Sequence, residues 1–366
     1  MKIIGPIAGI GSRLRPFTLS KPKAFITVAG KTVLDHILNK FTDTFDSDTE
    51  LILIVGYKKR QIISYLNEQN YEEHFKLTFI EQIPRGYKDQ IPYYWGLGEA
   101  VYLTRERFEE EKITNQDENK RKGALIFLGD MIPIDDYSYL LYRYYESDID
   151  GIITVMKVPK EDASSYGVVV VNGNNLIQKL VEKPKNFVSD LAIAGIYTFS
   201  NKTMKALYDN IKKYLDRRTE DSKEVYLTES LQDLVDQGFK IAAVELKKGI
   251  LDFGRPSEVL NGNKFLLEQN STKKEDFAQK NIVVEKSWLK NPVHIGKGVK
   301  IFNSVIGPHV SIADETTIEN SIISNSIIEK ATTLRNIITS NSIIGTNANI
   351  EGIIKDNLII GDKSVY

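Results

Sequence analysis

The sequence contains no cysteine and only four histidines among its 366 residues. Without cysteine, a disulfide scaffold, a Cys-ligated zinc or iron–sulfur site and a thiol nucleophile are all excluded. So few histidines also disfavour a histidine-rich metal site. We therefore expect any chemistry to come from the other polar side chains, mainly carboxylates, lysines and arginines.

The sequence also lacks an excess of one charge and a long apolar run. Its 48 lysines and arginines balance 49 aspartates and glutamates, whereas a dedicated nucleic-acid binder usually has a basic excess. No apolar stretch approaches the ~20 residues that span a bilayer. The short apolar run at the N-terminus is interrupted by Pro6 and soon followed by Arg13, unlike an export signal. We expect a cytoplasmic protein that binds neither nucleic acid nor membrane.

The first 250 residues alternate short apolar runs with amphipathic segments. This pattern is typical of βαβ units and a mostly parallel sheet, in which ligands bind at the carboxyl ends of the strands. The loops after Ile7, Gln82 and Gly129 are therefore candidate binding loops. Strands are predicted at residues 2–7, 51–56, 77–82, 124–129, 151–158, 166–171, 176–181, 191–199 and 240–246. Helices are predicted at residues 33–41, 61–69, 98–111, 139–146, 202–215, 227–237 and 256–268.

The C-terminal part has a different texture, because isoleucine recurs there with a short period. Nineteen of the 86 residues from Asn281 are isoleucine, and three 16-residue blocks align from Ala313. Each block divides into units of six, five and five residues, most of which end in an aliphatic side chain. This spacing predicts a left-handed parallel β-helix of the hexapeptide-repeat type. Because such a prism often pairs through a flat apolar face, we also expect a homo-oligomer.

The loop after the first strand is the best candidate for binding phosphate. Glycines at Gly9 and Gly11 let the backbone approach an anion, Arg13 is a bidentate donor, and Lys23 is a point charge. The loop is not a dinucleotide fingerprint, because Leu14 stands where that motif needs its third glycine. A P-loop ending at residues 30–32 also fails, because Phe25 stands where its first glycine belongs.

The full loop motif, G-x-G-S-R-L-R-P-x-T followed by P-K, resembles that of the sugar-1-phosphate nucleotidyltransferases, also called NDP-sugar pyrophosphorylases. The resemblance covers residues 1–260, because further motifs of that family follow in order: EQIP at 81–84, GLGEA at 96–100, LGD at 128–130, YGVV at 166–169, VEKP at 181–184, AIAGIY at 192–197, YLTE at 226–229 and LDFGRP at 251–256. It implies an α/β fold with a Rossmann-like nucleotidyltransferase domain and a mixed, mostly parallel sheet. The expected organisation is a catalytic domain at 1–255, a helix and linker at 256–280, and the β-helix at 281–366.

The resemblance also implies an enzyme and its reaction. An oxygen of a sugar-1-phosphate attacks the α-phosphorus of an NTP in line, and pyrophosphate leaves. By this resemblance, Mg²⁺ is the cofactor, with Asp130 and Asp252 as its ligands. Arg13 and Lys23 would hold the phosphates, and Lys183 the sugar phosphate. The remaining implied contacts are Ala8, Gly9, Gly11, Ser12, Gln82 and Gly96 with the nucleotide, and Gly167, Glu182 and Gly195 with the sugar.

Gln82 is the expected reader of the base, because a side-chain amide can pair with the O4/N3–H edge of uracil or thymine. Here the sequence departs from the usual family spacing. Thirteen residues separate Gln82 from Gly96, so either Gly86 or Gly96 can lie beside the base. The inserted segment at 85–95 is aromatic and is expected to form a lid or a subunit contact.

The resemblance favours a pyrimidine NTP, UTP or dTTP, with glucose-1-phosphate. One methyl group separates the two bases, so the sequence leaves both open. Three alternatives also stay open. They are a mannose-1-phosphate guanylyltransferase, a bifunctional enzyme whose β-helix transfers acetyl groups with His294 or His309 as base, and a non-catalytic regulatory subunit.

Overall fold

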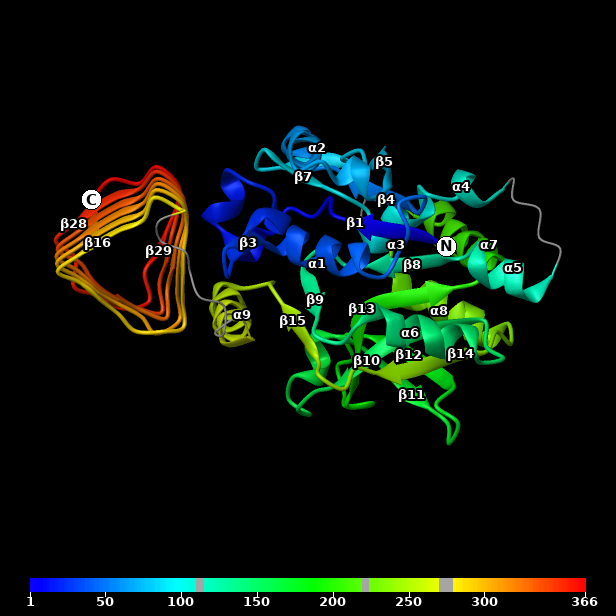
Figure 1. Ribbon diagram of the computed structural model, residues 1–366. Coiled ribbons are helices and arrows are strands. Elements are labelled where there is room, and N and C mark those ends of the chain that lie inside the picture. Colours follow the sequence, from blue (N-terminus) through cyan, green and yellow to red (C-terminus); the bar gives the residue numbers. More distant parts are fainter. Residues whose placement is uncertain (110–114, 219–223, 270–278) are drawn as a thin grey trace. The chain divides into compact units, whose positions relative to one another are not determined.

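The computed structural model describes residues 1–109, 115–218, 224–269 and 279–366 (Figure 1). Two compact units make up the chain. The first contains Met1–Gly9 and Ile37–Ile250, and the second contains Ile10–His36 and Leu251–Tyr366. The loop expected to bind phosphate thus belongs to the same unit as the C-terminal repeat, although about 240 residues separate them in sequence.

The first unit is built on a nine-stranded mixed sheet, which confirms the expected Rossmann-like α/β fold. The main strand order is β12-β11-β13-β8-β1-β4-β5, and β10 pairs with β13 and β14. β8, β1, β4 and β5 run parallel, while β13 is antiparallel to β8. The bounds are β1 Lys2–Pro6, β4 Glu50–Val55, β5 Lys76–Glu81, β8 Ala124–Phe127, β10 Gly151–Lys157, β11 Gly167–Val171, β12 Ile177–Glu182, β13 Leu191–Phe199 and β14 Ile241–Glu245.

The central strands are apolar throughout because both faces of the sheet are covered. In β4, the five residues from Leu51 to Val55 are all at most 1% exposed. In β1, Gly5 leaves room for Phe127 of the neighbouring strand, whose ring would lie 2.4 Å from an added Cβ. A continuous apolar run therefore indicates a buried strand here.

Helices of the first unit flank the sheet, while α9 belongs to the second unit, and several helices begin at polar caps. Ser200 caps α7 by accepting a hydrogen bond from the Thr203 backbone N–H at 3.1 Å, and Asn115 caps α5 in the same way from Glu118 at 2.8 Å. None of the described helices is long and apolar enough to cross a membrane. The bounds are α1 Val33–Thr42, α2 Lys59–Glu68, α3 Gly96–Tyr102, α4 Glu106–Glu109, α5 Gln116–Arg121, α6 Tyr137–Tyr145, α7 Asn201–Asp216, α8 Leu227–Asp236 and α9 Pro256–Gln269.

One predicted helix differs from what the structure shows. The helix expected at 98–111 is two helices, α3 and α4, and its last residues lie outside the described part of the chain. The inserted segment forms a hairpin of β6 (Gly86–Lys88) and β7 (Ile91–Tyr93). The expected linker lies mostly at 270–278, which is also outside the described residues.

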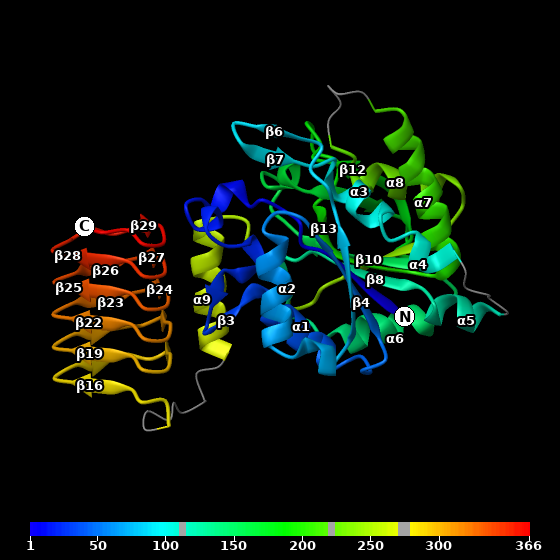
Figure 2. The ribbon, with the colours of Figure 1, turned by 90° about the horizontal axis from the view of Figure 1, so that it is seen from above.

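The second unit contains the predicted left-handed parallel β-helix, whose coils stack in Figure 2. Three parallel sheets of five, four and five strands run along it, and each coil adds at most one strand to each sheet. Ile301, Ile318, Leu334 and Ile350 occupy one register on successive coils and are fully buried, which explains the 16- and 17-residue spacing. The strands are β16 Val283–Glu285, β17 Trp288–Leu289, β18 Val293–Ile295, β19 Lys300–Phe302, β20 Val305–Ile306, β21 Val310–Ile312, β22 Thr317–Glu319, β23 Ile322–Ser324, β24 Ile327–Ile328, β25 Thr333–Arg335, β26 Ile338–Ser340, β27 Ile343–Ile344, β28 Asn349–Glu351 and β29 Ile359–Ile360.

Candidate active site

The carboxyl edge of the parallel strands gathers several expected site residues of the first unit. Ala8 follows β1, Gln82 follows β5, and Asp130 follows β8. Gly129 brings the ends of β8 and β1 together, because a Cβ there would lie 2.3 Å from Ile7 Cγ2. A charged hollow of about 580 Å³ lies instead at the amino ends of β1, β4 and β5, so it is not part of this site.

Gln82 has its side-chain amide fixed in one orientation. It is 3% exposed, and its Nε2 donates to Glu99 Oε2 at 2.8 Å and to the Gly96 carbonyl at 3.2 Å. Because a carboxylate only accepts hydrogen bonds, the nitrogen must face Glu99. Gln82 Oε1 forms no hydrogen bond to a described residue, and it is not one of the fully buried polar atoms that lack a partner. It is therefore accessible to solvent. The free side of the Gln82 amide is therefore a hydrogen-bond acceptor.

Glu99 is the centre of this arrangement, and the sequence analysis gave it no role. It is only 2% exposed and accepts hydrogen bonds from Arg85 Nε at 2.8 Å and from the Trp95 backbone N–H at 3.2 Å. The Arg85 guanidinium also lies 4.2 Å from the centre of the Trp95 ring. The sequence signal that could have identified Glu99 is a glutamate in the first turn of a helix, three residues after Gly96.

Gly96, rather than Gly86, lies next to Gln82. Gly96 has φ of +88°, and a Cβ there would lie 2.9 Å from Glu224 Cβ, so both conformation and packing require glycine. Gly86 instead pairs with Tyr93 across the hairpin. The hairpin presents exposed tyrosines, since Tyr87 is 69% exposed.

The residues expected to bind sugar also lie together in the first unit. Gly167 and Glu182 are cross-strand partners on β11 and β12, and Thr228 Oγ1 donates to Glu182 Oε2 at 2.6 Å. Lys183 Nζ lies 3.7 Å from Glu182 Oε1 and 5.6 Å from the centre of the Tyr226 ring. Thr228 and Tyr226 belong to the YLTE motif, to which the sequence analysis assigned no contact. Thr228 orients the Glu182 carboxylate, and the Tyr226 ring lies beside the Lys183 ammonium.

Gly195 lies at an irregularity of β13. Its φ is +73°, and the register of β13 against β10 shifts between Ile153 and Val155. A Cβ at Gly195 would lie 2.8 Å from Met131 Sδ, directly after Asp130 in sequence. Glycine is needed at this bulge for its backbone conformation and for the close approach of β9 (Met131–Pro133).

The second unit holds the rest of the loop expected to bind phosphate. Gly11 has φ of +66°, and a Cβ there would lie 3.0 Å from Lys23 Cβ, so the loop folds tightly on itself. Thr18 Oγ1 closes it by donating to the Gly11 carbonyl at 2.8 Å. Ser12 and Arg13 are exposed, and no ion pair joins Arg13 to a carboxylate in the described ranges. The Arg13 guanidinium is thus accessible to a ligand at the surface of this unit.

The LDFGRP motif places Asp252 near Arg13 within this unit. Asp252 Oδ1 accepts a hydrogen bond from the Gly254 backbone N–H at 2.8 Å. A Cβ on Gly254 would lie 3.1 Å from Asp252 Oδ1 and 3.3 Å from Arg13 Nη2. Glycine therefore lets a carboxylate and a guanidinium approach the same stretch of backbone. By contrast, Gly9, which ends the first segment of the other unit, has open space around it.

The donor set suits a metal that takes few protein ligands. Across the described residues, no group of three or more histidines, aspartates or glutamates converges as a metal site. Mg²⁺ is usually held by one or two carboxylates together with substrate phosphates. Asp130 belongs to the first unit and Asp252 to the second, and each supplies the carboxylate that such a metal site needs. Their assignment as Mg²⁺ ligands stays a prediction.

His294 and His309, the bases of the acetyl-transfer alternative, both pack within the second unit. His309 Nε2 lies 2.9 Å from Glu268 Oε1. A Cβ on Gly30 would lie 2.2 Å from His294 Nε2, so that ring covers the glycine closely. These contacts give both histidines structural surroundings and do not favour the acetyl-transfer alternative.

Comparisons with known proteins point to one family. The model of the family described as nucleotidyl transferase matches residues 7–269. The bifunctional protein GlmU of Methanocaldococcus jannaschii is 32% identical over 279 residues, which are 76% of this chain and 57% of that protein. This chain therefore spans little more than half the length of that relative.

Two further proteins are similar over most of their own length. The UTP–glucose-1-phosphate uridylyltransferase AglF of Haloferax volcanii is 28% identical over 261 residues, 70% of this chain and 93% of that protein. The solved structure of a UDP-glucose pyrophosphorylase from Acinetobacter baumanii has a TM-score of 0.57 and 22% identity, and the match covers 76% of this chain and 97% of that one. At this identity the structural likeness shows the fold.

Proposed function

The chain belongs to the nucleotidyl transferase family, and from this premise we propose that it joins UTP or dTTP to glucose-1-phosphate and releases pyrophosphate. A phosphate oxygen of the sugar would form a bond to the α-phosphorus of the nucleotide. The bond between the α-phosphorus and the bridging oxygen to the β-phosphorus would break, and its electron pair would leave with pyrophosphate.

The orientation of the Gln82 amide is the observation that carries the choice of base. Glu99 holds the nitrogen of that amide, so the oxygen faces the ligand. Uracil and thymine carry a donor at N3–H, which matches this acceptor, whereas cytosine and adenine carry an acceptor at the corresponding position. Guanine also has a donor there, and the resemblance to pyrimidine-specific enzymes favours uracil and thymine over it.

The cations are proposed to act on the phosphates. Arg13 is suited to grip pyrophosphate, because its fork of donors matches phosphate oxygens and its side chain is exposed. Lys23 and Lys183 would supply point charges to the α-phosphate and the sugar phosphate. Mg²⁺ bound by Asp130 and Asp252 would neutralise charge on the phosphates.

The sugar is proposed to lie between the Glu182 carboxylate and the glycine backbones. Glu182 is oriented by Thr228, so its carboxylate is fixed before sugar binds. A carboxylate can accept hydrogen bonds from two sugar hydroxyls. Gly167 and Gly195 would bring main-chain groups to the ring, as side chains there would occupy that space.

An activity matrix tests the proposal. The purified full chain is assayed with Mg²⁺ and each of UTP, dTTP, GTP, CTP and ATP against glucose-1-phosphate, mannose-1-phosphate and N-acetylglucosamine-1-phosphate, with pyrophosphate release as the readout. We expect the highest kcat/KM with UTP or dTTP and glucose-1-phosphate. Pyrophosphate release with GTP and mannose-1-phosphate alone would contradict the choice of base. No pyrophosphate release with any pair of substrates would contradict the proposed enzymatic activity.

We also propose that the β-helix forms a homo-oligomer through one apolar face. One register of the β-helix contains Trp288, Val305, Ile322, Ile338 and Ile354 on successive coils. All of these except the half-buried Val305 are large and exposed, at 67%, 50%, 42% and 76%. Four large apolar side chains in one straight row are unusual on an isolated surface. A second copy offers the same row, so the face is complementary to itself.

A further inference from the structure

One position of the β-helix carries a residue unlike its counterparts. The residue after the third strand of each coil is small in four coils: Gly296, Ala313, Gly345 and Gly361. In the remaining coil it is Glu329. The backbone hydrogen bonds are the same in both cases, since the Glu329 N–H donates to the next coil as that of Ala313 does. The coil itself therefore does not require a glutamate at this position.

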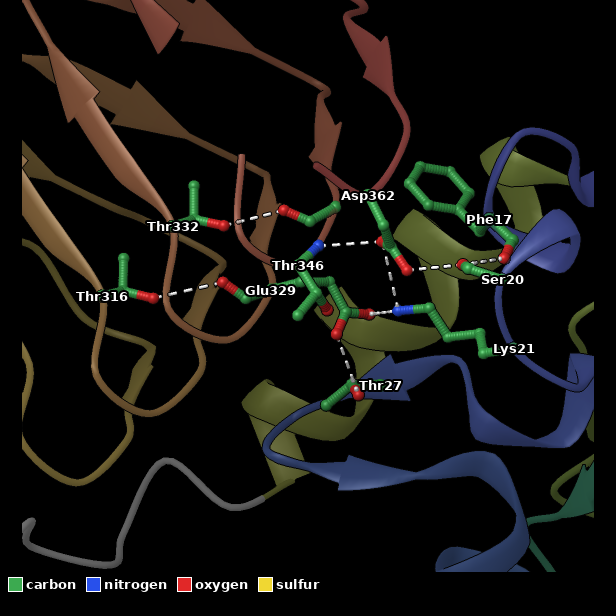
Figure 3. A network of polar contacts seen from close by, with 10 residues as sticks. Phe17, Ser20, Lys21, Thr27, Thr316, Glu329, Thr332, Thr346 and Asp362 are labelled. Carbon is green, nitrogen blue, oxygen red and sulfur yellow. Dashed lines mark hydrogen bonds and ion pairs between the residues drawn. The ribbon is translucent and has the colours of Figure 1, made fainter. Parts of the chain in front are cut away.

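Glu329 is buried against the loop of the second unit that carries Arg13 and Lys23. Its side chain is 7% exposed, and Oε1 lies 3.3 Å from Lys21 Nζ. Thr27 Oγ1 donates to Oε2 at 3.4 Å (Figure 3). Burial raises the pKa of Glu329, and the positive charge of Lys21 acts in the opposite direction. A carboxylate in this position therefore depends on Lys21 for its charge to be tolerated.

Asp362, two coils further on, reaches the same loop (Figure 3). Its Oδ1 accepts a hydrogen bond from the Thr346 N–H at 2.8 Å, an internal contact of the β-helix. Its Oδ2 accepts a hydrogen bond from Ser20 Oγ at 2.5 Å, and Oδ1 lies 3.7 Å from Lys21 Nζ. Gly361 allows this approach, because a Cβ there would lie 3.0 Å from Pro16 Cβ.

A buried asparagine supports the same docking from α9. Asn263 is fully buried, and its Oδ1 accepts hydrogen bonds from the Ala29 N–H at 2.8 Å and from Ser311 Oγ of the β-helix at 2.6 Å. The segment at 10–36 is thus tied to the β-helix directly at residues 20, 21 and 27, and through α9 at Ala29.

The loop itself has little regular structure to hold it. Between Gly11 and Phe25 it contains only three 3₁₀ turns of three residues each. Such turns have poor hydrogen-bond geometry and do not persist alone. Ser20 and Lys21, which the β-helix holds, lie between Arg13 and Lys23 in sequence. The conformation of the two proposed phosphate ligands therefore depends on contacts from outside the loop.

We propose that Glu329 and Asp362 are positioning residues, through which the β-helix holds Lys21 and Ser20 and so keeps Arg13 and Lys23 in their phosphate-binding conformation. The inference rests on the proposed function for its catalytic consequence, but its structural part does not. The β-helix is then a part of the phosphate site in the same chain, in addition to any role in assembly.

Hydrogen exchange of the full chain tests the structural part without any substrate. In Glu329→Gln and in Lys21→Met, backbone amides at 11–25 should exchange about tenfold faster or more, since a hydrogen-bonded charge is lost. Amides of the β-helix strands should not change. Asp362→Asn is the milder variant, because it retains the oxygen that accepts from Thr346. Glu315→Gln is the matched control, because it removes a glutamate of the β-helix whose partner, at 3.6 Å, is Lys330.

Steady-state kinetics test the catalytic part on the same variants. In Glu329→Gln, kcat/KM for the nucleotide should fall about tenfold, while the KM for the sugar-1-phosphate stays unchanged. The double variant Lys21→Met/Glu329→Gln should lose little more than either single variant, because both remove one interaction. The proposal is overturned if loop exchange matches the Glu315→Gln control, or if exchange rises while kcat/KM does not change. The two parts can also fail separately. If the wild-type chain lacks transferase activity but the variants still show faster exchange, the proposed function and the catalytic role are both refuted, while the docking is supported.

Discussion

The substitution Glu99→Gln should relax the discrimination between UTP and CTP. In the wild-type protein, Arg85 donates to one oxygen of the Glu99 carboxylate, and Gln82 donates to the other. A glutamine at position 99 keeps its oxygen toward Arg85, because a guanidinium only donates. Its amide nitrogen then faces Gln82, which must turn its own oxygen inward. The turned Gln82 presents a donor to the base, which matches N3 of cytosine rather than N3–H of uracil.

The structure limits the size of this effect. The Gln82–Glu99 bond is a hydrogen bond to a buried charge, worth about 1.5–3 kcal/mol, or roughly tenfold to a hundredfold in an equilibrium. Gly96 opposes the turn, because its carbonyl also accepts from Gln82 Nε2 at 3.2 Å. The Trp95 N–H opposes it too, because it donates at 3.2 Å to the same Glu99 oxygen, which the substitution replaces by a donor. We therefore expect the ratio of kcat/KM for UTP to that for CTP to fall by about tenfold, at the lower end of this range.

The assay compares kcat/KM for the two nucleotides at a fixed concentration of glucose-1-phosphate. Glu81→Gln is the matched control, because Glu81 directly precedes Gln82 but pairs with Lys59 at the surface. It should leave the ratio unchanged. If Glu99→Gln melts at the wild-type temperature and keeps the wild-type ratio, the orientation of the Gln82 amide does not select the base, and the reasoning is refuted.

Substitutions at four other residues test other parts of the molecule. Lys23→Ala and Asp252→Asn should each lower kcat by about a hundredfold or more, because each removes charge stabilisation at the phosphates; retained activity in a folded variant would remove that residue's role. Ile322→Lys should lower the oligomer mass in sedimentation velocity, because it places a charge in the exposed apolar row of the β-helix, and an unchanged mass would exclude that face. Asp135→Ala should lower the free energy of unfolding in urea by about 2 kcal/mol, since this 7% exposed carboxylate accepts three backbone hydrogen bonds from residues 247–249. Asp135→Asn, which keeps one acceptor oxygen, should lose less, and an equal loss would mean that charge rather than hydrogen bonding matters.

The periodic parts of the molecule could be predicted from sequence, because each repeats a local rule. The buried β4 appeared as a continuous apolar run, and the β-helix as isoleucines spaced by one coil. The hairpin at 86–93 gave no such signal. Its two-residue turn, Asp89–Gln90, has positive φ at both positions, where Asn-Gly is the usual sequence. Its strands also lack the alternation of apolar and polar residues that indicates a hairpin.

Candidate site residues can be proposed from the sequence where a motif is contiguous, but their distant partners cannot. Gln82, Glu182 and Asp252 each lie in a short motif, and their roles stay predictions. Their orienting partners lie 17 residues away for Glu99 and 46 residues away for Thr228. The contact of Lys21 with Glu329 spans about 300 residues and has no local signature. Its only trace in the sequence is a glutamate at a coil position where the other coils carry glycine or alanine.

Because the coils stack at a constant spacing, the β-helix also fixes the distance between residues on different coils. Neighbouring parallel strands are separated by about 4.8 Å, so Glu329 and Asp362 lie about two such steps apart along the prism. Removing or adding one coil between them would move one carboxylate by a full step, further than a hydrogen bond can stretch. The 16-residue blocks between these two residues are therefore fixed in number, whereas coils on the side of residue 281 can vary without changing this spacing.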